Sequence, residues 1–269
     1  MALGVTALPH FIFISSPNPN YWFHSRSMTL PKMEDLIHRY VTPNVTKITS
    51  SSQTTDFIKR VRKGGSVFQL TVPEEGHPLI QQFTDISIKY LGLYCTFIYD
   101  INPEVTSPTL TVYRSTECSL SFSISDESQL EQIIEQYRFS HYRSLNWYEW
   151  NRFFLQSPSI VFLNNRNTVE KSGAHDLFKN ISKEYCNKME IGINDVGKEV
   201  TILTNTHQPA IEETNVLYAY PKKQCSLMKS YKEGFEGIKA MIEGAENDEK
   251  CMKFESNTFP MKEETNQEL

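Results

Sequence analysis

Apolar and polar residues alternate along several short segments, and one arrangement of these segments recurs. Residues 107–113 and 214–220 alternate with a period of two, which predicts a strand in each. Cys118 stands ten residues after Pro108, and Cys225 stands ten residues after Asn215. The sequence therefore predicts two strand–hairpin units whose hairpins share one register.

Each predicted hairpin leads into an amphipathic helix. Residues 127–138 and 233–242 carry apolar side chains at spacings of three and four, which place them on one helical face. A third copy opens the chain, with a strand at 8–14, a returning strand at 21–23 and a helix at 31–40. Three copies at a period of roughly one hundred residues indicate an internal repeat.

A matching half precedes the second and third copies. The pattern predicts, in order, a helix, a strand, a helix and a strand at 54–62, 66–72, 79–90 and 94–100, and again at 147–155, 159–163, 174–185 and 189–194. A strand–helix–strand unit of this length implies parallel pairing through a right-handed crossover. The predicted fold class is α/β: mixed sheets of four to five strands, flanked by helices.

The repeat divides the chain into four parts. Residues 1–43 form the C-terminal half of a unit whose first half is missing from the chain, and 44–142 and 143–244 form two complete units. Residues 245–269 are acidic and poor in apolar side chains, so we expect this tail to be disordered.

The order of elements, with a proline before the hairpin, resembles the thioredoxin fold. A tandem of such domains with almost no linker resembles the protein disulfide isomerase family. Residues 5–9 and 106–109 are similar to the loop that holds a cis-proline beside the dithiol in that family. The resemblance implies Pro9 and Pro108 as cis-proline candidates, whereas the last unit has Asn215 at this position.

The chain departs from a catalytic domain of that family at the dithiol. Such a domain has Cys-x-x-Cys at the start of the first crossover helix, where the helix N-terminus lowers the thiol pKa. Here residues 72–78 read Val-Pro-Glu-Glu-Gly-His-Pro and residues 164–168 read Asn-Asn-Arg-Asn-Thr. Both units therefore resemble the redox-inactive middle pair of an isomerase, and no catalytic residue is predicted. We expect Met1 to be an internal residue of a longer protein.

The cysteines are few and far apart. The chain has Cys95, Cys118, Cys186, Cys225 and Cys251. This spacing indicates neither a disulfide framework nor a metal site, so no cofactor and no metal are predicted. We interpret Cys95 and Cys186 as buried small hydrophobes. Cys118 and Cys225 could instead pair with a partner.

One predicted helix is unusually aromatic. Residues 145–155 contain five aromatic side chains, which are our peptide-binding candidates: Trp147, Tyr148, Trp150, Phe153 and Phe154. Aromatic residues anchor interfaces at low entropic cost. Trp147, Trp150 and Phe154 also have the spacing of a core face, so Tyr148 and Phe153 are the better candidates for exposure. The resemblance implies that the second inactive domain grips unfolded chains through an apolar pocket.

Charge and hydropathy limit the classes of partner that the chain can bind. The formal net charge is -5, and residues 243–269 hold eight acids against three bases, so the remaining chain is close to neutral. A neutral body favours no nucleic acid, and no apolar run approaches the roughly 18 residues of a membrane span. The predicted partners are unfolded or partly folded polypeptides. The final Glu268-Leu269 is similar to the retrieval signal of the endoplasmic reticulum lumen.

Three hypotheses follow for the function. The leading one is a non-catalytic, substrate-binding chaperone segment of a protein disulfide isomerase-like protein in the secretory pathway. The alternative is a fragment of a catalytic thiol–disulfide oxidoreductase whose Cys-x-x-Cys lies upstream of Met1. The third is a calcium store like calsequestrin, which is also built of thioredoxin-like domains. A net charge of only -5 argues against the third, because loading calcium needs dense carboxylates.

Overall fold

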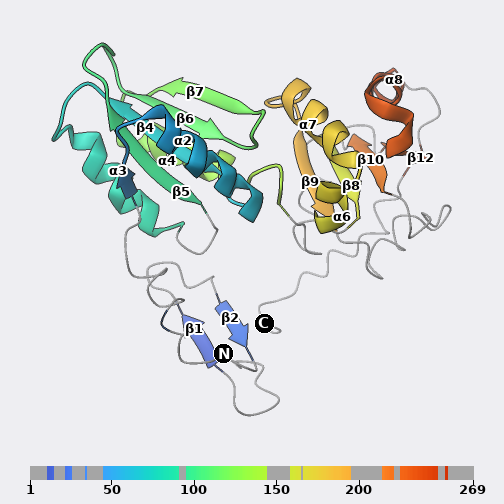
Figure 1. Cartoon of the computed structure of the whole chain (residues 1–269), viewed down its shortest axis with the longest axis horizontal. Helices are drawn as coiled ribbons and strands as arrows, with labels where there is room; N and C mark the ends of the chain where they lie inside the picture. The colour runs from blue at the N-terminus through green and yellow to red at the C-terminus, as the bar shows by residue number, and fades with distance from the viewer. Residues whose placement is uncertain are drawn as a thin grey trace.

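The fold contains two successive units of sheet and helix. The computed structural model describes residues 11–14, 22–25, 34, 45–90, 95–143, 158–164, 166–194, 214–220, 225–247 and 252–253. Within these ranges two five-stranded sheets follow one another along the chain, each with its own helices (Figure 1). We call residues 45–143 the first unit and residues 158–253 the second unit.

The sheet of the first unit is mixed, as predicted. Its strands are β3 (Val45–Lys47), β4 (Val67–Val72), β5 (Thr96–Ile101), β6 (Thr109–Tyr113) and β7 (Ser119–Ser123), in the spatial order β3-β5-β4-β6-β7. β5 runs parallel to β3 and β4, whereas β6 and β7 run antiparallel to their neighbours. The sequence pattern missed β3, because three residues are too few to show a period.

Helices cover both faces of this sheet. They are α2 (Ser51–Ile58), the short 3-10 helix η1 (Lys59–Lys63), α3 (Pro78–Ile88) and α4 (Glu127–Tyr137). Asp126 begins α4, because its carboxylate accepts a hydrogen bond from the backbone N–H of Gln129 at 2.9 Å. Gly64 ends η1 with φ 105°, a left-handed conformation that glycine adopts without a steric penalty.

An aromatic cluster fills the core between this sheet and helices α3 and α4. Phe68 of β4 stacks on Phe97 of β5, and Phe83 of α3 meets Phe97 edge-on, each at 5.3 Å between ring centroids. All three rings are buried. Alternate residues of β4 point to the opposite face, where Val67 joins an apolar cluster with Val61 of η1.

The second unit repeats the arrangement. Its strands are β8 (Ser159–Leu163), β9 (Glu190–Asn194), β10 (Asn215–Tyr220), β11 (Cys225–Ser230) and β12 (Met252–Lys253), in the spatial order β12-β11-β10-β8-β9. Its helices are α6 (Arg166–Lys171), α7 (Ala174–Glu184), η5 (Tyr231–Glu233) and α8 (Gly234–Glu246). Every residue of β8 is buried, which is typical of a central strand covered on both faces.

Strand β12 corrects one prediction about the tail. Met252 and Lys253 pair with Ser226 and Cys225 at the edge of the second sheet. Helix α8 also runs on to Glu246. The predicted disorder from residue 245 therefore does not hold for these positions, because the sheet edge offers backbone partners that composition does not reveal.

A separate two-stranded hairpin precedes the first unit. β1 (Phe11–Ile14) pairs antiparallel with β2 (Trp22–Ser25), which confirms the two strands predicted there. Of the helix predicted at 31–40 the structure describes only Glu34, which is helical.

The hairpins of the two units differ in register, contrary to the prediction from the cysteine spacing. Tyr113 pairs with Ser119 in the first hairpin, whereas Tyr220 pairs with Cys225 in the second. The connecting turn is therefore one residue shorter in the second hairpin. As a result Cys118 lies in the turn, whereas Cys225 lies in strand β11.

None of the helices in the described part of the chain is both long enough and apolar enough to cross a membrane.

Candidate functional site

The turn between β4 and α3 stands where a thioredoxin-like domain carries its dithiol. Gly76 makes the turn into α3 with φ 83°. His77 then begins the helix, since its Nδ1 accepts a hydrogen bond from the N–H of Leu79 at 3.3 Å, and Pro78 occupies the first turn. This turn is capped by an imidazole and holds no thiol.

In the second unit the equivalent place follows β8. Asn164 is 8% exposed, and its side-chain amide donates to the hydroxyl of Thr214 at 3.3 Å. The sequence predicted one helix here, beginning at residue 174. The structure has a short helix, α6, before α7. Where a dithiol would lie, the chain has the buried side chain of Asn164, and the crossover helix is divided into α6 and α7.

Pro108 lies directly before β6 and is half-buried. Its carbonyl accepts a hydrogen bond from the N–H of Ile124 at 2.9 Å, which closes the base of the β6–β7 hairpin. In the second unit Thr214 makes the same closure with Tyr231 at 3.1 Å. Pro108 therefore stands where the fold places the proline that opens the hairpin, and its role as a cis-proline stays a prediction.

The other predicted site residues lie outside the described residues. These are the second proline candidate and the aromatic set: Pro9, Trp147, Tyr148, Trp150, Phe153 and Phe154. They remain predictions.

A small polar pocket lies at the carboxyl ends of β3 and β5, beside the first turn of α2. Its volume is about 260 Å³, and residues 48–51 line it together with Gln69 and Asp100. The carboxylate of Asp100 accepts hydrogen bonds from Gln69 at 2.8 Å and from Thr71 at 2.9 Å. Carboxyl ends of parallel strands are the usual position of ligand crevices in α/β sheets. The pocket suits small polar groups and not the apolar side chains of an unfolded chain.

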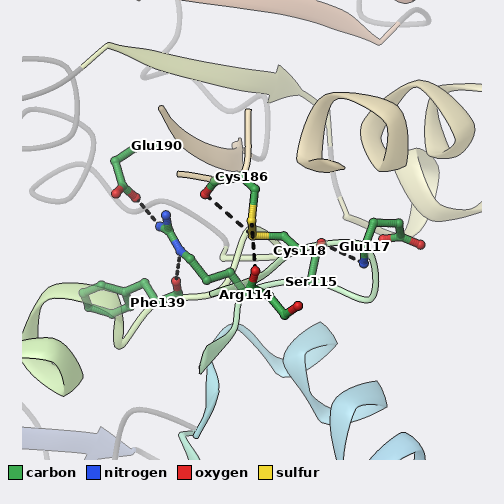
Figure 2. The surroundings of a disulfide bond; sticks show 8 residues. Arg114, Ser115, Glu117, Cys118, Phe139, Cys186 and Glu190 are labelled. Carbon is green, nitrogen blue, oxygen red and sulfur yellow. Dashed lines mark hydrogen bonds and ion pairs between the residues drawn. A yellow bond between two sulfur atoms is a disulfide. The ribbon is translucent and has the colours of Figure 1, made fainter. Parts of the chain in front are cut away.

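Sequence reasoning missed the most distinctive feature, a disulfide between the units. Cys118 and Cys186 form a bond between the β6–β7 turn and the end of α7 (Figure 2). Cys118 is 1% exposed and Cys186 is half-exposed. The interpretation of Cys186 as a buried small hydrophobe was therefore wrong, and Cys118 finds its partner within the chain. The bond links residues 68 apart in sequence, which spacing alone gives no reason to pair.

An ion pair lies beside the disulfide. Arg114, in the same turn as Cys118, donates to the Glu190 carboxylate of β9 at 2.6 Å and to the carbonyl of Phe139 at 3.3 Å (Figure 2). Only 3% of the Arg114 side chain is exposed, against 33% for Glu190. The guanidinium is thus held between the two units by oxygen atoms from both of them.

The segment that follows α4 completes this junction. Tyr142 packs on Phe178 of α7 with ring centroids 4.7 Å apart. His141 is fully buried, and within the part of the chain that the structure describes neither of its ring nitrogens has a hydrogen-bond partner. Burial, with a smaller contribution from the charge of Arg114, holds the pKa of His141 well below its usual range. The imidazole at the junction is therefore neutral near pH 7.

Cys95, which is not part of a disulfide, is not reactive. Cys95 lies just before β5, and its thiol donates to the carbonyl of Arg138 at 3.2 Å. Burial raises the pKa of this thiol to about 12. Since the thiolate is the nucleophile in disulfide exchange, Cys95 takes no part in such chemistry near neutral pH.

Comparison with solved structures identifies the fold. The bb fragment of ERp72 matches with a TM-score of 0.50 and 10% identity, over 78% of this chain and 100% of the fragment. Human ERp44 (form II) matches with a TM-score of 0.44 and 9% identity, and ERdj5 (form II) with 0.30 and 14%. The match covers 84% of this chain and 64% of ERp44, and 92% of this chain and 35% of ERdj5.

The match to the ERp72 fragment shows the fold. The chain has the thioredoxin-like fold found in proteins of the protein disulfide isomerase family, as the order of its elements predicted. No protein-family model and no curated protein matches the chain.

Proposed function

We propose that this chain is a non-catalytic, substrate-binding segment of a protein disulfide isomerase-like protein. It binds unfolded or partly folded polypeptides and assists their folding in the lumen of the endoplasmic reticulum. The observation that carries the proposal is the state of the thiols in the thioredoxin-like units. Among the described cysteine side chains, two are joined in a disulfide, and the third belongs to the half-buried Cys95, where desolvation raises the thiol pKa to about 12.

The fold without its dithiol leaves binding as the role that these units can fill. The two turns that would carry Cys-x-x-Cys contain His77 and Asn164 instead. The aromatic residues at 147–154 supply the material for an apolar binding surface. The likeness to a fragment of ERp72 supports the thioredoxin-like fold on which this proposal rests.

The disulfide also supports the proposed compartment. Disulfides persist in oxidising environments such as the lumen of the endoplasmic reticulum and are rare in the cytosol. The Cys118–Cys186 bond and the final Glu268-Leu269 therefore favour the same location.

The test is suppression of aggregation. Denatured citrate synthase is diluted into buffer with and without the purified, oxidised chain, and light scattering is followed. We expect a two-fold molar excess of the chain to reduce the scattering by at least half. Tyr148→Ser with Phe153→Ser should abolish this effect, whereas Ile80→Ser, which removes a half-buried apolar side chain from α3, should leave it unchanged. No suppression by the wild-type chain would refute the proposal.

A second candidate function is that of a thiol–disulfide oxidoreductase whose Cys-x-x-Cys lies upstream of Met1. The β1–β2 hairpin favours it, since this hairpin repeats the antiparallel hairpins β6–β7 and β10–β11. Sequencing the 5′ end of the messenger RNA tests it. A reading frame with Cys-x-x-Cys roughly forty residues upstream, at the helix start that the repeat predicts, would support the enzyme. A cap site just before Met1 would exclude it.

A further inference from the structure

We propose that the Cys118–Cys186 bond is a site of thiol–disulfide exchange, through which a dithiol reductant enters at Cys186 and releases the two units from their fixed arrangement. This inference is independent of client binding. It rests on the unequal exposure of the two cysteine residues and on the place of the bond, which ties the β6–β7 turn to the second unit.

The unequal exposure decides which sulfur is attacked. Cys118 is 1% exposed and closes the β6–β7 turn, where its carbonyl accepts a hydrogen bond from the N–H of Arg114 at 3.0 Å. Cys186 follows the end of α7 and is half-buried, between the buried Tyr185 and the exposed Asn187. Exchange requires access of the incoming thiolate to one sulfur along the S–S axis. Solvent access therefore favours attack at Cys186.

The exchange proceeds in two steps that conserve atoms and electrons. The thiolate of the reductant bonds to Cys186 Sγ, the Sγ–Sγ bond breaks, and Cys118 leaves as a thiolate that takes up a proton. The second thiolate of the reductant then attacks the reductant's own sulfur, and Cys186 leaves and is protonated. The dithiol is oxidised to a disulfide by two electrons, and the Cys118–Cys186 bond is reduced to two thiols.

The bond crosses a junction that is otherwise held by one apolar cluster and a few further links. Ile48, Val61, Val67, Ile98 and Tyr142 of the first unit belong to a buried apolar cluster that continues into the second unit. None of the extensive helix and strand contacts in the described part of the chain crosses from one unit to the other. The polar links and the ring contact across the junction are made by the β6–β7 turn and by the segment after α4. Besides the disulfide they are the Arg114–Glu190 ion pair and the packing of Tyr142 on Phe178, with a hydrogen bond from the N–H of Ile193 to the carbonyl of Arg143 at 3.0 Å.

These remaining links are suited to a hinge. Tyr142 and Arg143 belong to the segment that follows α4, at the end of the first unit. Their links to the second unit therefore form a pivot close to where the chain leaves the first unit. The disulfide and the ion pair are the links that tie the β6–β7 turn to the second unit (Figure 2). The ion pair is partly open to water at Glu190, where screening weakens it. Once the disulfide is cut, the turn is held by that ion pair and by its contacts with the pivot segment.

The first test uses the wild-type protein, so that folding of a variant is not at issue. The oxidised chain is treated briefly with reduced glutathione, a monothiol that leaves a mixed disulfide, and is quenched with acid. Peptide mapping by mass spectrometry then locates the glutathione. We expect at least ten times more label on Cys186 than on Cys118. Equal labelling, or more on Cys118, would overturn the proposed direction of attack.

The second test measures the arrangement of the units by small-angle X-ray scattering. Dithiothreitol should increase the radius of gyration of the wild-type chain, and circular dichroism should show that the helices remain. Cys118→Ser with Cys186→Ser should give the larger radius without dithiothreitol and should not respond to it. If reduced and oxidised wild-type protein scatter identically, the units are not released and the proposal fails.

Discussion

Removing the disulfide should cost the protein about 4 kcal/mol of unfolding free energy. The bond closes a loop of 68 residues. If a cross-link acts by lowering the entropy of the unfolded chain by about 2.1 + 1.5R ln n cal/mol/K, this loop gives about 15 cal/mol/K, or about 4.4 kcal/mol at 25 °C. The value is large against the roughly 5–15 kcal/mol of a whole domain, so the effect should be plain.

The assay is urea unfolding of Cys118→Ser with Cys186→Ser, followed by circular dichroism. Serine is the appropriate replacement, because Cys118 Sγ lies 3.6 Å from the carbonyl of Cys186, and a hydroxyl at residue 118 can donate to it. With a slope of about 2 kcal/mol per molar urea, the midpoint should fall by about 2 M. Dithiothreitol should move the wild-type midpoint to that of the variant.

A matched control separates the cross-link from the loss of a buried sulfur. Cys95→Ser replaces a half-buried cysteine that is not in a disulfide, and the new hydroxyl can donate to the carbonyl of Arg138, as the thiol does. We expect a change below about 1 kcal/mol. If the double variant also changes by less than about 1 kcal/mol, the reasoning from chain entropy is refuted.

Four further outcomes are expected. Phe83→Ala should lower the unfolding free energy by about 3–5 kcal/mol in urea titrations, since the ring fills the core between α3 and the sheet; a loss below 1 kcal/mol would contradict this. Glu190→Gln should cost about 1–3 kcal/mol in the same assay, because it leaves the buried guanidinium of Arg114 without its charged partner; an unchanged midpoint would show the pair to be inert. The pKa of His141 is lowered in the folded protein, so the unfolded chain binds the proton more readily and stability is lost as pH falls below about 6.5, by up to about 1.4 kcal/mol per unit. His141→Leu should remove that part of the pH slope. Cys95 should not react with a disulfide reagent at pH 8 until the chain is unfolded, since its thiol pKa is about 12; rapid labelling of folded protein would disprove the burial.

Elements with a clear period could be predicted from the sequence, and those that depend on a neighbour could not. Helix α4 is predicted by the apolar stripe along its sequence, and Asp126 caps its start. Parallel pairing of β4 with β5 followed from the crossover length alone. Strand β3 has three residues and β12 has two, and each exists because an adjacent strand offers free backbone groups. Such strands are specified by pairing, which a single segment does not display.

The candidate site was predicted only in part, for a related reason. The missing Cys-x-x-Cys could be read directly, because that motif is local and its place in the fold is fixed by the repeat. The junction between the units could not, since Arg114, Cys118 and Glu190 come together only when both units have folded. His141 also gave no signal, because a histidine beside a tyrosine reads as an ordinary surface position until its burial is known.

The repeat itself explains why its two matched cysteines lie at different places in their hairpins. Both follow the hairpin strand at the same sequence distance, yet the second hairpin turns one residue earlier. Cys225 therefore lies in β11 and pairs with Tyr220, so its backbone is part of the sheet. Cys118 stays in the turn, at the end of the sheet that faces α7 of the next unit, and can reach Cys186. A single residue of turn length thus decides whether a hairpin can be covalently linked to its neighbour. Inserting one residue between Cys225 and Ser226, so that the new residue pairs with Tyr220 and Ser226 keeps its pairing with Ala219, should move Cys225 out of the strand and into the turn. Faster hydrogen exchange of the Cys225 backbone amide would show this, and unchanged exchange would contradict it.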